Sequence, residues 1–136
     1  LDRYDDRLKD KLLNVLLTPT KIYVRSILEL ISKVRVKGIA HITGGGFIEN
    51  IPRIFPEGIG CEIVKDSYPL PEIFSIMREK SETSDAQIYN TFNMGIGMVV
   101  CVDEKDVDLA LASLTASGEK AYVIGKTVKG KGVELK

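Results

Sequence analysis

Apolar residues recur at the spacing of amphipathic helices in three stretches of the chain, residues 19–34, 70–81 and 104–118. In the first stretch, Thr18 can cap the helix and Pro19 suits its first turn, and Gly118 is expected to stop the third helix. The apolar faces of these helices consist of Ile22, Ile27, Leu30, Ile31 and Val34 in the first, Ile73, Ile76 and Met77 in the second, and Val107, Leu109, Leu111 and Leu114 in the third.

Short apolar runs between the helices are typical of buried strands. The chain ends in two further strands that flank a turn at Lys129–Gly132, and together they predict a hairpin. Strands are therefore expected at residues 36–43, 59–66 and 95–103, and twice within residues 120–136.

Two other segments predict short helical pieces. Residues 47–50 and 52–55 predict a helix broken in the middle, because Pro52 disfavours helical geometry at Ile51 before it. Residues 85–93 predict a helical turn followed by a loop. This order of helices and strands indicates an α/β (α+β) fold, a layered sandwich in which helices cover a mixed β-sheet. The terminal hairpin argues against a purely parallel sheet.

Composition and charge exclude several classes of protein. The 136 residues are 44% hydrophobic and 28% charged, which fits one compact domain with a core of its own. Nineteen basic residues balance nineteen acidic ones, so neither nucleic acid nor an anionic membrane is expected as a partner. No apolar run approaches the roughly 20 residues of a membrane span, and the first residues are too charged for a signal peptide. The expected location is the cytoplasm.

The cysteines predict neither a metal site nor a disulfide framework. Cys61 and Cys101 stand forty residues apart, without a CxxC pair and with a single histidine, His41, in the chain. We therefore expect two reduced thiols buried in strands, since free cysteine is among the most buried residue types.

The stretch HITGGGFIENIPRIFP, residues 41–56, places consecutive glycines at the start of a helix. Backbone N–H groups with no side chains in front of them, at the positive end of a helix dipole, form an anion-binding geometry. The alternative is a tight turn at which strand and helix pack closely, but three glycines in a row favour a ligand. The residues concerned are Thr43, Gly44, Gly45 and Gly46.

Two polar residues flank these glycines, and each has two interpretations. His41 can donate to a phosphate or a carbonyl group, or it can be a satisfied histidine at the end of a strand. Asn50 can point back at the glycines or simply end the helix.

A second glycine-containing stretch, NTFNMGIGM, covers residues 90–98. Gly95 and Gly97 are two apart on a predicted strand, so one face is bare and either a ligand or a packed helix can approach it. Asn93 can satisfy a turn or offer its amide to a substrate. By contrast, the GKT at residues 125–127 is part of a strand, because Lys120 occupies the position where a phosphate-binding loop needs glycine.

Three stretches, LLTPTKIYVRSILEL, AHITGGGFIENIPRIFP and NTFNMGIGMVV, closely resemble the C-terminal half of the phosphoribosylformylglycinamidine cyclo-ligases, also called aminoimidazole ribonucleotide synthetases. The resemblance spans residues 17–126. TGGG alone is also compatible with four related families of the same architecture: formylglycinamidine ribonucleotide synthase, selenophosphate synthetase, thiamine-monophosphate kinase and a hydrogenase maturation factor. The other two stretches favour the cyclo-ligase.

The resemblance implies an ATP-dependent ring closure in de novo purine biosynthesis. Formylglycinamidine ribonucleotide would become aminoimidazole ribonucleotide, with release of ADP and phosphate, and Mg²⁺ would neutralise the triphosphate. The family's N-terminal ATP-binding domain, with most of the interface of the expected homodimer, has no counterpart here. Residues 1–17 are then a linker remnant and lead-in, and residues 18–136 are the C-terminal domain. Such a domain needs no cofactor of its own, and alone it would not catalyse the reaction.

The resemblance also suggests a site in one wall of the active-site cleft. His41 and Asn93 are the candidate polar or catalytic contacts, and no general base is identified. The substrate's ribose phosphate, or a nucleotide phosphate, is assigned to the three glycine amides. The predicted binding residues are Thr43, Gly44, Gly45, Gly46, Asn50, Gly95 and Gly97. Two other classes remain open, a non-catalytic phosphate-binding module and a structural domain in which the glycines serve packing.

Overall fold

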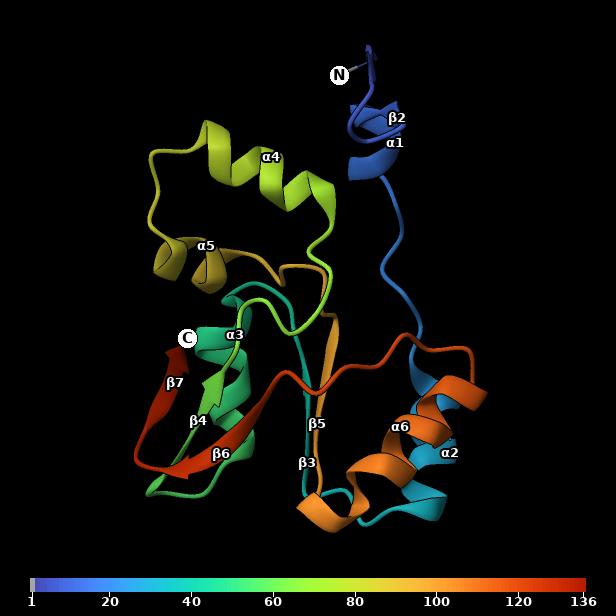
Figure 1. Ribbon diagram of the computed structural model, residues 1–136, viewed down its shortest axis with the longest axis vertical. Coiled ribbons are helices and arrows are strands. Elements are labelled where there is room, and N and C mark those ends of the chain that lie inside the picture. Colours follow the sequence, from blue (N-terminus) through green and yellow to red (C-terminus); the bar gives the residue numbers. More distant parts are fainter. Residues whose placement is uncertain (1) are drawn as a thin grey trace.

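The computed structural model describes residues 2–136 and has an α+β architecture of short helices and small sheets (Figure 1). The strands form three sheets: β1 (Tyr4–Asp5) with β2 (Asp10–Lys11), β3 (Gly38–His41) with β5 (Met98–Cys101), and β4 (Ile59–Ile63) with β6 (Gly125–Lys129) and β7 (Gly132–Leu135). The helices are α1 (Leu12–Leu16), α2 (Val24–Lys33), α3 (Gly46–Asn50), η1 (Ile51–Ile54), α4 (Glu72–Lys80), α5 (Asp85–Thr91), η2 (Glu104–Asp106) and α6 (Val107–Ala116). The predicted fold class is confirmed.

The last two strands do not form the predicted hairpin with each other. β4 lies between them, antiparallel to β6 and parallel to β7, so the sheet is mixed as expected. The turn between β6 and β7 is where it was predicted, but it carries the chain around the end of β4, and the Gly130 amide donates to the Gly58 carbonyl at 2.9 Å. This order gives the buried strand β4 a backbone partner on both edges.

The first long helix starts later than predicted. α2 begins at Val24, and the residues before it run as an extended segment from α1. Thr18 does not cap α2, because its hydroxyl donates to the Asn14 carbonyl of α1. Ile22 is 83% exposed rather than on the inner face. The predicted core positions Leu30 and Val34 are buried, and they pack against Ala110 of α6 (Figure 1).

The broken helix after β3 is confirmed, but the physical reason for the break was wrong. Ile51 has helical backbone angles, φ −64° and ψ −44°, although it precedes Pro52. Pro52 stands at the start of a 3₁₀ turn, where its missing N–H is not needed. The chain therefore continues without a gap from α3 into η1, and Ile51 is buried.

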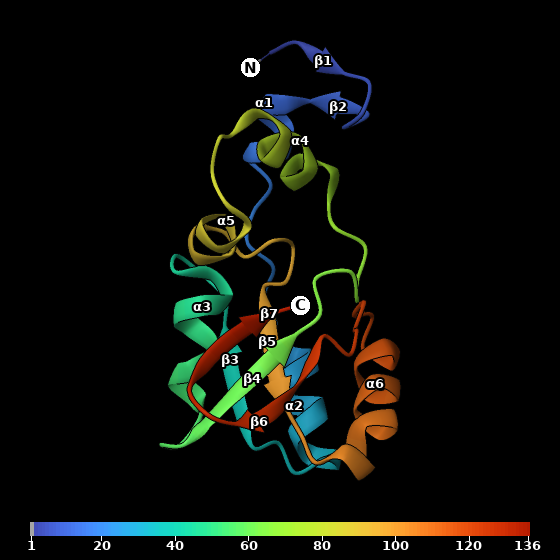
Figure 2. The same ribbon diagram turned by 60° about the vertical axis from the view of Figure 1, so that its left-hand side comes forward.

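The remaining predicted helices are confirmed in place, with differences in burial. α6 follows the one-turn η2 and ends two residues before Gly118, but Ala110 and Ser113 are its buried residues, and Leu109 is half exposed. α4 has no buried residue, and its predicted inner positions are only half-buried. Figures 1 and 2 show α4 beside the N-terminal hairpin at one end of the molecule, where Arg7 pairs with Glu72 and Glu79.

Two clusters of apolar side chains form the core. The larger lies between the β3–β5 pair, α3, α5 and β4, and the smaller lies between α2 and α6. Among residues 2–136, no helix has both the length and the apolar character needed to cross a membrane. The fully buried side chains of the larger cluster are Ile42, Phe47, Ile51, Tyr89 and Met94.

Both cysteines are free thiols on strands, as predicted, but only Cys61 of β4 is buried, and Cys101 of β5 is half-buried. Burial first, and the nearby Cys101 second, raises the pKa of the Cys61 thiol to about 11. Burial raises the pKa of the Cys101 thiol as well. Because the thiolate is the reactive form and Cys61 is the more buried thiol, we expect iodoacetamide near neutral pH to modify Cys101 faster than Cys61.

Peptide mapping after timed alkylation measures both rates. A Cys101→Ser variant gives the Cys61 rate alone, and unfolding in denaturant should make the two rates similar. Faster modification of Cys61 in the folded protein would contradict the expected burial.

Candidate functional site

The three stretches that carry the resemblance meet at one end of the β3–β5 pair. His41, the last residue of β3, pairs with Met98 of β5, and the Ile42 amide donates to the Gly97 carbonyl at 2.9 Å. Tyr23, just before α2, reaches both strands: its ring centroid lies 6.2 Å from that of His41, edge to face, and its hydroxyl covers Gly97. Tyr23 was not singled out by sequence reasoning, although it lies in the first of the three motifs.

The three glycines after β3 differ in what requires them. Gly45 and Gly46 have positive φ angles of 95° and 50°, whereas Gly44 does not and has open space around it. A Cβ on Gly46 would overlap the Tyr89 carbonyl oxygen of α5, so this glycine allows α3 and α5 to pack closely. The Gly46 amide also donates to the Thr43 carbonyl at 3.0 Å. Close packing therefore explains why residue 46 is a glycine, but it does not explain why residue 44 is one.

Asn50 points back at the glycines, which decides between its two interpretations. Its side chain is buried, and Nδ2 donates to the carbonyl oxygens of Gly46 at 2.8 Å, Gly44 at 3.1 Å and Thr43 at 3.4 Å. With its amide group used in this way, Asn50 shapes the loop from inside.

The exposed side of the glycine loop carries one carboxylate and one guanidinium group. Glu49 lies over Gly45, accepts a hydrogen bond from Asn90 at 3.2 Å and pairs with Arg53 at 3.7 Å. Arg53 also donates to Asn50 Oδ1 at 3.5 Å. An anion at this loop would lie near Glu49, so Arg53 is the cation available to offset that charge. Neither side chain was predicted as part of the site.

Gly95 and Gly97 do not leave a bare strand face, which corrects the sequence interpretation. Both precede β5, and each is covered by a different side chain, Gly95 by Pro71 and Gly97 by Tyr23. Asn93 forms the turn before them: its Oδ1 accepts a hydrogen bond from the Gly95 amide at 3.0 Å. The side-chain oxygen of Asn93 therefore satisfies a turn, which was one of its two interpretations. Its NH₂ group makes no hydrogen bond to residues 2–136.

An ion pair between the half-exposed Lys21 and the mostly buried Glu119 lies on the other side of Tyr23. Lys21 Nζ is 2.5 Å from Glu119 Oε2, and the Ser26 hydroxyl donates to Glu119 Oε1 at 2.8 Å. Burial alone would raise the pKa of Glu119, but the hydrogen bonds from Lys21 and Ser26 lower it overall. These side chains are part of the lining of a mainly apolar cavity of about 800 Å³ between β5, α2, α6 and residues 118–127.

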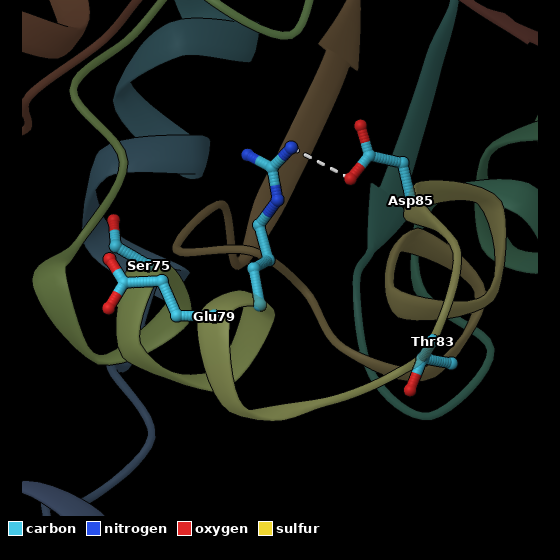
Figure 3. A pocket seen from close by; sticks show the side chains of 5 residues that line it. Ser75, Glu79, Thr83 and Asp85 are labelled. Atoms are coloured by element: carbon cyan, nitrogen blue, oxygen red, sulfur yellow. Dashed lines mark hydrogen bonds and ion pairs between the residues drawn. The ribbon is translucent and has the colours of Figure 1, made fainter.

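A smaller pocket of about 390 Å³ lies between α4 and the start of α5 (Figure 3). Asp85 accepts hydrogen bonds from Arg78 at 2.7 Å and from Lys65 at 2.9 Å, and these cations lower its pKa, Lys65 foremost. Glu79 is engaged by Arg7. Because its charged groups are already paired, this pocket is a structural junction and a poor candidate site. Its lining consists of Ser75, Arg78, Glu79, Thr83 and Asp85.

The described part of the chain, residues 2–136, contains no cluster of three histidine, cysteine or carboxylate side chains able to hold a metal ion.

Comparison with known proteins identifies the family. The sequence model for the C-terminal domain of AIR synthase related proteins matches residues 2–136, and the chain belongs to this family. The chain is 54% identical to the phosphoribosylformylglycinamidine cyclo-ligase of Bacillus cytotoxicus and 53% identical to that of Bacillus mycoides, in each case over 133 residues and 98% of the chain. It spans only 38% of the length of these relatives. The family resemblance predicted from the three motifs is confirmed.

The fold is also that of a solved structure, Escherichia coli HypE, a hydrogenase maturation protein. The match has a TM-score of 0.67 at 24% identity and covers 92% of this chain and 41% of that one. At this identity the likeness concerns the architecture alone.

Proposed function

We propose that residues 18–136 are the C-terminal domain of a cytoplasmic phosphoribosylformylglycinamidine cyclo-ligase, and that residues 1–17 lead in from its ATP-binding domain. The convergence of the three motifs on Tyr23, His41 and Gly97 carries this proposal. It is supported by the identity of more than half of the aligned residues to the Bacillus enzymes. The complete enzyme is proposed to be a homodimer.

In this proposal the chain forms one wall of the site that binds formylglycinamidine ribonucleotide. ATP with Mg²⁺, bound by the preceding domain, would supply the phosphoryl group that makes the formyl amide oxygen a leaving group. This chain's residues bind and orient the ribonucleotide, so that its own nitrogen closes the ring.

The phosphate of the ribonucleotide is proposed to bind at the exposed part of the glycine loop. The amides of Gly44 and Gly45 and the hydroxyl of Thr43 are the donors, and Arg53 supplies positive charge. His41, exposed at the end of β3, contacts the same ligand. The free NH₂ group of Asn93 is the second proposed polar contact.

A chimaera tests the proposal: this chain replaces the matching residues of the Bacillus cytotoxicus enzyme, and ATP-dependent formation of aminoimidazole ribonucleotide is measured. We expect turnover within about tenfold of the parent enzyme. A tenfold loss corresponds to an increase of about 1.4 kcal/mol in the activation free energy, caused by imperfect contacts between the exchanged domain and the rest of the enzyme. Within the active chimaera, Gly44→Asp should raise the KM for the ribonucleotide at least about tenfold, because the new carboxylate repels its phosphate.

Gly44→Ala is the matched control, since a methyl group fits the open space at this position without adding charge. A folded chimaera that forms no product would contradict the cyclo-ligase assignment. Equal KM values for the two Gly44 variants would mean that the phosphate of the ribonucleotide does not bind at the glycine loop.

A further inference from the structure

Glu119 ties together two parts of the chain that are distant in sequence. It follows the end of α6, where its own amide donates to the Leu114 carbonyl at 3.0 Å. Its carboxylate holds Lys21 of the extended segment and Ser26 of α2. Ser26 is buried, and its hydroxyl also lies 3.0 Å from the Tyr23 carbonyl oxygen. Side chains on both sides of Tyr23 in the sequence, Lys21 and Ser26, therefore contact one carboxylate.

This ion pair differs from the ordinary surface pairs of the molecule. The Glu119 side chain is 15% exposed, whereas most of the other carboxylates paired with lysine or arginine are exposed by a third or more. Surface pairs contribute little to stability, but a mostly buried carboxylate with two donors has a defined geometry. Glu119 can therefore fix the position of the Tyr23 ring.

Tyr23 has the properties of a ligand contact. Its hydroxyl lies over the backbone of Gly97 and makes no hydrogen bond to residues 2–136, and the residue is part of the lining of the large cavity. Burial raises the pKa of the phenol, so the hydroxyl is a neutral donor at physiological pH. The ring edge rests against His41.

We infer that Tyr23 is a substrate-binding residue that donates its hydroxyl to an oxygen of the ribonucleotide, and that Glu119 is the residue that positions it against His41. This inference rests on the proposed function, since it assigns residues to the same site. It gives the first motif, which contains Lys21 and Tyr23, a role in binding.

The kinetic test uses the active chimaera. Tyr23→Phe keeps the ring and removes the donor, so the KM for the ribonucleotide should rise about tenfold while kcat stays within about twofold and the KM for ATP is unchanged. Glu119→Gln should raise the same KM about threefold. Because Glu119 acts through Tyr23, the double variant should be no worse than Tyr23→Phe alone.

Glu62→Gln is the matched control. Glu62 of β4 is also partly buried, with a side chain 22% exposed, and it pairs with Lys126 of β6 and with Lys136, which follows β7. We expect it to leave both KM values unchanged. If the effects of Tyr23→Phe and Glu119→Gln multiply, Glu119 does not act through Tyr23 and the inference is wrong.

A second measurement does not depend on turnover. His41 is the only histidine of the chain, so its ring proton signals in the NMR spectrum of residues 1–136 are unambiguous. Glu119→Gln should shift them, because the adjacent Tyr23 ring moves, and Glu62→Gln should not. Unshifted His41 signals in Glu119→Gln would overturn the positioning role even in an active chimaera, whereas an inactive parent chimaera with shifted signals would contradict only the cyclo-ligase assignment.

Discussion

Replacing Gly46 by alanine should destabilise the protein by about 3 kcal/mol or more. The new methyl group would overlap the Tyr89 carbonyl oxygen and lie 2.7 Å from that of Phe92, and both are backbone atoms that cannot turn aside. The φ angle of 50° adds a cost of about 1 kcal/mol for a residue with a side chain. Overpacking in a tight interior adds roughly 1–3 kcal/mol. Equilibrium unfolding in urea measures the loss.

Gly44→Ala is the control for this prediction, because nothing lies within 4 Å of a Cβ at Gly44. Its free energy of unfolding should stay within about 0.5 kcal/mol of the unchanged protein. If both variants lost the same stability, α3 and α5 would not be in the close contact described above. The expected difference separates a glycine needed for packing from one that leaves the backbone open to a ligand.

The glycine loop marks the limit of what local sequence can predict. Three consecutive glycines indicate that the chain needs bare backbone there. Packing explains Gly46, whereas ligand access at Gly44 stays a prediction. The packing partners of Gly46 are Tyr89 and Phe92, which lie more than forty residues further along the chain. No pattern within the loop identifies such partners, so the two reasons could not be assigned to particular glycines.

The same limit explains the errors in the fold. Local signals at Thr18 and Pro19 are sound for a helix start, but the extended segment that follows brings Lys21 and Tyr23 to Glu119 and His41, and those contacts are not local. A short apolar run correctly located β4, and the turn at Lys129–Gly132 correctly located β6 and β7 on either side of it. They did not reveal that β4 lies between the other two, because strand order depends on pairing between distant segments.

Asn50→Asp should be the second strongly destabilising change, with a loss of about 3 kcal/mol at neutral pH. The two side chains have the same shape, but a carboxylate cannot donate to the three carbonyl oxygens that Asn50 Nδ2 now satisfies. It would be buried and would face these acceptors directly. Urea unfolding over a range of pH measures the effect.

The pH dependence of this loss has a defined sign. Burial beside carbonyl oxygens disfavours the charged carboxylate, so its pKa in the folded variant lies above that in the unfolded chain. Below the pKa of the unfolded chain, the carboxyl is protonated and can donate one hydrogen bond, so the loss of stability is smallest there. The loss grows as the pH rises through the pKa of the folded variant. The difference in free energy of unfolding between the variant and the unchanged protein should thus widen from about pH 4 to about pH 8.

Asn93→Asp is the matched control, because Asn93 uses its oxygen as an acceptor for the Gly95 amide and a carboxylate can do the same. A difference that did not depend on pH would show that Asn50 holds the loop by shape rather than by donating hydrogen bonds.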